Sequence, residues 1–87
     1  SLLPSLINKM GPESRLIRDL ALAYAERGEA RRRAGRTSGA CSDMQEALHW
    51  ILKLRATAPE DMQLAQDETW LKGRLKRLTS CPAPSKV

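Results

Sequence analysis

The sequence has few aromatic residues, a single histidine, two cysteines and no long apolar run. Its 87 residues include two tryptophans, one tyrosine and no phenylalanine. This scarcity, together with little β-branching and no alternation of apolar and polar residues, argues against a β-sheet. The uncharged segments are far shorter than the roughly 20 apolar residues needed to cross a bilayer, so we predict no transmembrane helix. A chain of this length holds one small domain.

The few cysteines and the lone histidine limit metal and redox chemistry. Cys41 and Cys81 are too few for a disulfide framework, and with His49 they cannot complete a Cys2His2 zinc site. We therefore predict two free thiols, no metal and no cofactor, in a reducing intracellular compartment, either cytoplasm or nucleus. Because the sequence begins with Ser1 rather than methionine, we also expect it to be a piece of a longer protein.

Proline and glycine divide the chain into segments with helical periodicity. Pro12 can open a helix that continues to about Arg33, Gly35 lies in a connection, and a second helix begins near Thr37 or Ser38. A third helix is expected after the sequence Thr57-Ala58-Pro59-Glu60-Asp61, with Thr57 as a cap and Pro59 in its first turn. The prediction is an all-α, up-down-up three-helix bundle over residues 12–79, with a short lead-in helix over 1–11 and a flexible tail over 80–87.

The middle of the chain resembles a tetratricopeptide helical hairpin. The resemblance rests on aromatic, small and bulky positions at Tyr24, Gly28, Gly35, Ala40, Met44 and Ala47-Leu48. With the third helix and its Trp70-Leu71-Lys72-Gly73-Arg74-Leu75 sequence added, residues 14–79 are similar to a microtubule-interacting and trafficking (MIT) domain. The resemblance implies a groove between neighbouring helices that receives a short helical or extended peptide from a partner.

Residues with catalytic potential are scarce, and each has a structural explanation. His49 falls on the exposed side of the second helix, and Cys41 falls on its apolar stripe. Glu60-Asp61 suits a helix start, and Glu68 can pair with Lys72 one turn later. We therefore predict that the chain is not an enzyme.

Positive charge is concentrated in two clusters. The first occupies the end of the first helix and the following loop, at Arg27, Arg31, Arg32, Arg33 and Arg36, and the second spans residues 72–77. In an up-down-up bundle the first and third helices are parallel, so both clusters should meet at one pole. Such a field attracts an acidic protein segment, nucleic acid or an anionic membrane surface. The nucleic-acid alternative would use Arg31, Arg32, Arg33 and Arg36.

Trp70 has two possible roles. It lies about 100° from the apolar line of the third helix, so it either rims a groove or packs over the first helix or the lead-in segment with its indole N–H facing water. The first role predicts a partner-binding set of Trp70, Arg74, Arg77, Arg27 and Arg31, which would dock an acidic or amphipathic segment. A third possibility is self-association through a lead-in segment exchanged between copies, with apolar residues Leu2, Leu3, Leu6 and Ile7.

Overall fold

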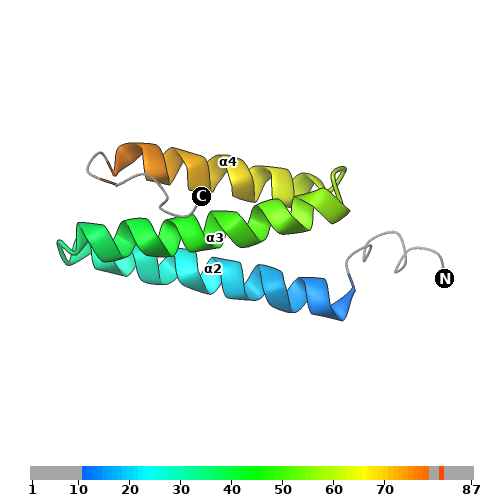
Figure 1. Ribbon diagram of the computed structural model, residues 1–87, viewed down its shortest axis with the longest axis horizontal. Coiled ribbons are helices and arrows are strands. Elements are labelled where there is room, and N and C mark those ends of the chain that lie inside the picture. Colours follow the sequence, from blue (N-terminus) through cyan, green and yellow to red (C-terminus); the bar gives the residue numbers. More distant parts are fainter. Residues whose placement is uncertain (1–10, 79–80, 82–87) are drawn as a thin grey trace.

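The computed structural model describes residues 11–78 and residue 81, which contain three α-helices (Figure 1). They are α2 (Pro12–Arg33), α3 (Thr37–Thr57) and α4 (Met62–Arg77). The helices run up, down and up, and the described residues contain no strand. The predicted all-α bundle is thereby confirmed. A lead-in helix was expected over residues 1–11, and its residues 1–10 lie outside the described residues, as does all of the expected tail except Cys81.

The helix boundaries follow from local chemistry at the two connections. Gly35 adopts a φ of +80°, a conformation that favours glycine, and the Arg36 N–H then donates to the Arg31 carbonyl at 2.7 Å. At the second connection, the Asp61 carboxylate accepts from the N–H groups of Gln63 and Leu64 at 2.9 and 3.2 Å. This side chain caps α4, because it satisfies donors that the first turn leaves open.

The predicted start of the third helix needs correction. Thr57 is the last residue of α3 rather than a cap of α4, and its hydroxyl donates to the Leu54 carbonyl at 2.9 Å. Pro59 lies in the turn that precedes Asp61. A proline followed by two acids can begin a helix at any of several residues. The helix begins after Asp61, because the Asp61 carboxylate caps the first turn.

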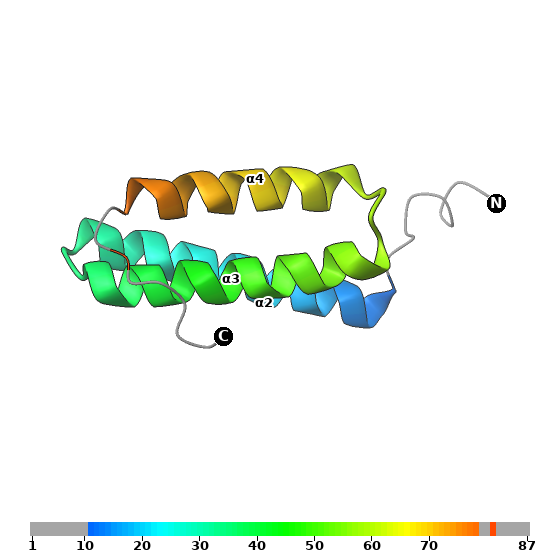
Figure 2. The ribbon, with the colours of Figure 1, turned by 45° about the horizontal axis from the view of Figure 1, so that its top comes forward.

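α3 is the central helix of the bundle. It packs against α2 on one side and against α4 on the other, and α4 lies over the α2–α3 pair (Figure 2). The largest fully buried side chains come from α3 and α4, and they are Met44, Ile51, Leu64, Leu71 and Cys41. α2 contributes small buried residues, Ala21, Ala25 and Gly28, so it approaches α3 closely.

α2 approaches α3 closely at Gly28. A Cβ placed there would lie 3.2 Å from the Asp43 Cβ, 3.2 Å from the Met44 Cε and 3.3 Å from the Ala40 carbonyl oxygen. At Gly73, by contrast, an added Cβ would meet nothing within 4 Å. The first glycine is therefore required by packing, whereas the second only lowers helix propensity.

The two cysteines form a disulfide, so the prediction of free thiols is wrong. Cys41 and Cys81 are joined with a Cα–Cα separation of 5.5 Å, across 40 residues of sequence. The antiparallel arrangement of α3 and α4 explains the bond, because the chain leaving α4 arrives beside the first turns of α3 (Figure 1). Disulfides persist mainly in oxidising compartments, so the argument from free thiols for a reducing compartment no longer holds.

A search of the described helices for membrane spans finds none with the length and apolar character to cross a bilayer.

We expect Cys81→Ser to lower the free energy of unfolding by about 2–4 kcal/mol, because it opens a long covalent loop and gives the unfolded chain more freedom. Urea unfolding followed by circular dichroism measures the loss. In a reducing buffer, wild type and variant should have the same stability. A difference that persists after reduction would contradict a role of the disulfide itself.

A matched pair of glycine substitutions tests the close approach of α2 and α3. Gly73→Ala should raise the free energy of unfolding by about 0.5–1 kcal/mol, because alanine favours the helix and the site is open. Gly28→Ala should lower it by about 1 kcal/mol, since crowding against α3 outweighs the same gain in propensity. Equal stabilisation by both variants would refute the packing requirement at Gly28.

Candidate functional site at the basic pole

The C-terminal ends of α2 and α4 lie at the same end of the bundle (Figure 1). We call this end the basic pole, and define it by its cationic residues Arg27, Arg31, Arg32, Arg33, Arg36, Arg74, Lys76 and Arg77. A direct interhelical contact joins α2 to α4 at this end. Arg74 Nε of α4 lies 3.2 Å from Glu29 Oε2 of α2, an ion pair whose angle falls outside that of a hydrogen bond.

Part of the positive charge is neutralised by Asp43, a buried residue of α3. Its carboxylate accepts from Arg27 Nε and Nη2 at 3.0 and 2.9 Å, and Arg31 Nη1 lies 3.3 Å away. The side chain of Asp43 is only 4% exposed, so this carboxylate depends on the two guanidinium groups for its counter-charge. The same hydrogen bonds raise the pKa of Arg27 above its ordinary value. Two guanidinium groups sharing one carboxylate leave one net positive charge.

Glu29 pairs with two further cations and offsets one of their charges. Besides its contact with Arg74, it accepts from Arg32 Nη2 and Nε at 3.1 and 3.3 Å on the exposed end of α2. The glutamate therefore joins the two basic clusters, because it bridges α2 and α4. This bridging position was not predicted from the sequence.

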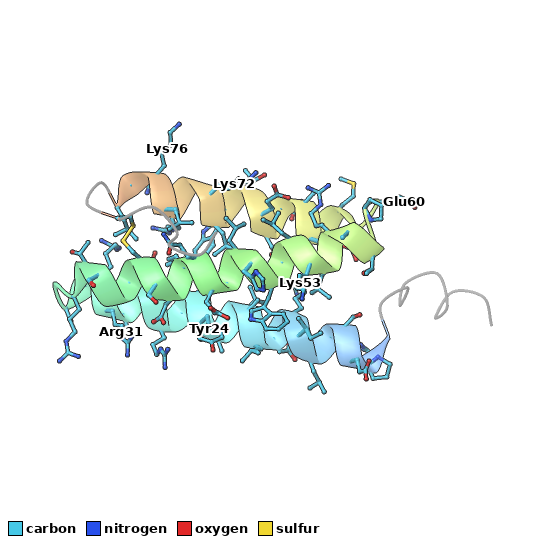
Figure 3. The ribbon with its side chains drawn as sticks, in the orientation of Figure 1. Tyr24, Arg31, Lys53, Glu60, Lys72 and Lys76 are labelled. Carbon is cyan, nitrogen blue, oxygen red and sulfur yellow. A yellow bond between two sulfur atoms is a disulfide. The ribbon has the colours of Figure 1, made fainter. Side chains whose placement is uncertain are left out.

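The remaining cations of the basic pole are exposed. Arg33, Arg36, Lys76 and Arg77 make no ion pair or hydrogen bond with another side chain in the described part of the chain. Figure 3 shows Lys76 pointing away from the bundle. These four side chains are available to an anionic partner, because they need not first leave an internal carboxylate.

Trp70 is exposed beside these cations. Its side chain is 42% exposed, and the guanidinium carbon of Arg74 lies 4.9 Å from the ring centroid. The ring borders a shallow hollow of about 400 Å³ on the outer face of α4, lined by Met62, Ala65, Gln66, Thr69 and Trp70. Arg74 and Arg77 follow Trp70 at one and two helical turns along the same edge. An apolar hollow and a row of cations are thus continuous on one helix.

The structure separates the five residues of the predicted partner-binding set into two groups. Trp70, Arg74 and Arg77 share one edge of α4, whereas Arg27 and Arg31 reach Asp43 on α3. On α2, Arg18 and Glu29 form ion pairs with α4, and they lie on the other side of the helix from Arg27 and Arg31. The predicted residues therefore share a pole but not one continuous surface.

A hollow between α3 and α4 was missed by the sequence analysis. It has a volume of about 430 Å³ and is lined by Gln45, Leu48, His49, Leu52, Leu75 and Cys81. Leu52 is 42% exposed there, one helical turn after Leu48. These two leucines are spaced i, i+4, so they lie on the same face of α3. From this spacing one could have predicted that the apolar face of α3 extends to this hollow.

Trp50 and His49 are neighbouring ring side chains on α3. Trp50 is half-buried at the edge of the core, and its indole N–H donates to Glu46 Oε2 at 3.0 Å. His49 is exposed, as predicted, and meets Trp50 edge to face at 5.2 Å. Among the residues that the structure describes, no group of three His, Cys, Asp or Glu side chains could hold a metal ion.

Ion pairs also hold α4 onto its neighbours away from the basic pole. Arg18 Nε of α2 donates to Asp67 Oδ2 at 2.8 Å, and Arg55 Nη1 of α3 donates to Glu68 Oε1 at 2.6 Å. Glu68 also pairs with Lys72 at 2.6 Å, the i,i+4 pair expected from the sequence. Hydrogen bonds from Lys72 and Arg55 lower the pKa of Glu68 below its ordinary value.

Comparison with protein-family models finds no match, and searches of curated proteins and of solved structures also find no match. The resemblance to MIT and tetratricopeptide domains therefore stays a prediction from the sequence.

The lowered pKa of Glu68 predicts the pH dependence of its contribution. Because the folded-state pKa is below the unfolded value of about 4.3, the contribution is present above that value and is lost as the pH falls through the folded-state pKa. We expect Glu68→Gln to cost about 0.5–1 kcal/mol of unfolding free energy at neutral pH, and less as the solution becomes acidic. The exposed Glu26 makes no ion pair within residues 11–78, so Glu26→Gln is the control. If Glu68→Gln lowers the free energy of unfolding by the same amount at every pH, the loss does not come from the ionised carboxylate, which would contradict this prediction.

Proposed function

We propose that the chain is a non-catalytic interaction module that docks an acidic, amphipathic segment of a partner protein along the outer edge of α4. The observation that carries this proposal is the continuity of the Trp70 hollow with the cations Arg74 and Arg77. An apolar side chain of the partner would fill the hollow beside the indole. Acidic side chains one or two turns further along would face the guanidinium groups.

Exposure and charge support this choice of surface. A large aromatic side chain that is already fixed by a stacked arginine loses little conformational freedom on binding, and such residues commonly dominate interface energies. Arg77 and Arg33 are exposed at the same pole, and they add long-range attraction for an acidic partner. Arg27 and Arg31 are engaged by Asp43 and contribute through their net charge only.

The nucleic-acid alternative is less well supported. Of its four arginines, Arg31 pairs with Asp43 and Arg32 pairs with Glu29, which leaves Arg33 and Arg36 without a counter-charge in the described residues. Single-strand binding usually adds aromatic rings on which successive bases stack. Trp70 is the large aromatic side chain with the greatest exposure among residues 11–78, and it lies on α4 rather than within this arginine cluster.

Trp70→Ala tests the proposed docking surface. The probe is a fluorescein-labelled helical peptide with glutamates along one edge and leucines at i, i+4 spacing, measured by fluorescence anisotropy. We expect the substitution to weaken binding by 10-fold or more, because it removes the centre of the contact. The free energy of unfolding should change by less than about 1 kcal/mol, since the ring is well exposed.

Matched charge reversals locate the site. Arg77→Glu should weaken peptide binding, whereas Arg15→Glu, an exposed cation near the start of α2, should not. Leu52→Lys distinguishes the hollow between α3 and α4, because it changes that hollow and leaves the α4 edge intact. If the Trp70→Ala and Arg77→Glu variants still bind the peptide and Leu52→Lys does not, the docking site is the hollow between α3 and α4 rather than the α4 edge. Salt-dependent binding of a short DNA duplex or single strand, with no binding of the acidic peptide, would replace the proposal with the nucleic-acid function.

A further inference from the structure

α2 carries an exposed apolar stripe that lies outside the proposed docking edge, and of its residues only Tyr24 packs against the bundle core. Leu16 and Leu20 are 67% and 45% exposed, Ala23 is exposed, and Tyr24 is half-buried at the end of the row. We call these four residues the α2 stripe. They lie at i, i+4, i+7 and i+8, so they share one face of the helix. Figure 3 shows Tyr24 and Arg31 on the side of α2 away from α4, and the stripe therefore remains open on that side.

Part of the α2 stripe lines a hollow. The residues around this hollow have the spacing used in a known mode of helix packing. This hollow has a volume of about 270 Å³ and is lined by Leu20, Ala23, Tyr24 and Arg27. These four residues have the spacing i, i+3, i+4 and i+7. In knobs-into-holes packing, four residues with this spacing form the hole that receives one side chain from a facing helix. The hollow is therefore shaped for a side chain of another helix.

The sequence of α2 supplies a matching side chain when a second copy runs antiparallel about a two-fold axis at Leu20. In that register Leu20 faces the partner's Leu20, and Leu16 faces the partner's Tyr24. Leu16 is then level with the middle of the partner's hollow, which spans residues 20–27. One register therefore covers the most exposed leucine of the stripe and fills the hollow in both copies.

The charges at the ends of the stripe select the antiparallel arrangement. The same register places Glu13 opposite the partner's Arg27. Glu13 is exposed and makes no ion pair among residues 11–78, and the Arg27 side chain is 55% exposed although it contacts Asp43. Since Asp43 is shared with Arg31, this part of the surface keeps a net positive charge. A parallel pair would instead bring like charges together at both ends.

We infer that the α2 stripe binds a second copy of this chain, with the two α2 helices antiparallel and Leu16 of each copy inside the hollow of the other. The interface is isologous, because each contact occurs twice about the axis. One helix face is smaller than a standard protein interface of about 1,600 Å² total, so the dimer forms and dissociates readily. This association is separate from the docking of an acidic segment on α4.

Sedimentation equilibrium of the full 87-residue chain over a range of concentrations tests the dimer. Leu20→Lys should raise the dimer Kd by about 100-fold, because it places two charges at the centre of the interface. Met62→Lys is the matched control, since Met62 is 72% exposed but lies on α4, and it should leave the Kd unchanged. Circular dichroism checks that each variant is folded. If Leu20→Lys is not folded, Leu16→Lys at the more exposed position takes its place.

Two further variants identify the contacts. Glu13→Arg should weaken the dimer by about 5- to 10-fold in low salt and by less in high salt, because it reverses one charge of each symmetric pair. Leu6→Lys lies in the lead-in segment and should leave the dimer intact. A wild-type chain that stays monomeric up to about 1 mM would overturn the inference, as would a dimer that survives Leu20→Lys. A dimer that is lost with Leu6→Lys would also overturn it, in favour of exchange of the lead-in segment.

Discussion

The structure depends on α3 burying apolar side chains on two sides at once. Cys41, Met44, Ala47 and Ile51 are fully buried within it, because α2 covers one flank and α4 covers the other. Neither outer helix could bury its apolar face against the other alone, since α2 and α4 meet mainly through charged side chains. The position of every surface feature, including the basic pole, therefore follows from how the outer helices pack on α3.

The arginines of the basic pole serve two different purposes. Arg27 and Arg31 compensate a buried carboxylate on α3, and a buried charge without a partner would cost several kcal/mol. Arg33 and Arg77 contact no internal acid in the described residues, so they create potential at the surface instead. Counting the positive residues in the sequence cannot tell which arginine has which role, because the role depends on the neighbouring side chain that each arginine contacts.

The sequence predicts the helices well because their signals are local. Pro12 opens α2, Gly35 adopts the positive φ that its connection needs, and the apolar periodicity identifies Met44 and Leu71 as core residues. The third helix begins later than predicted, since either of two adjacent acids could cap it and Asp61 is the one whose carboxylate accepts from the first turn. The parallel direction of α2 and α4 follows from topology alone, so the convergence of the two basic clusters could also be predicted.

Features that join distant residues were harder to predict. The burial of Asp43 against Gly28 depends on the crossing of α2 and α3, which no local sequence pattern reveals. The disulfide was excluded on the number of cysteines, although the antiparallel topology places residue 81 beside residue 41. The division of the predicted binding set also depends on helix rotation, because Arg27 lies on the side of α2 opposite Arg18 and Glu29, which form ion pairs with α4.

The disulfide has a consequence for cleavage of the chain. Its covalent loop encloses most of α3, the connection with its exposed Pro59 and Glu60, and all of α4. A protease that cut this connection would produce two fragments still tied together at the opposite end of the bundle. Such a nicked molecule would keep its mass under non-reducing conditions and would separate into two pieces only when the sulfur–sulfur bond was also broken.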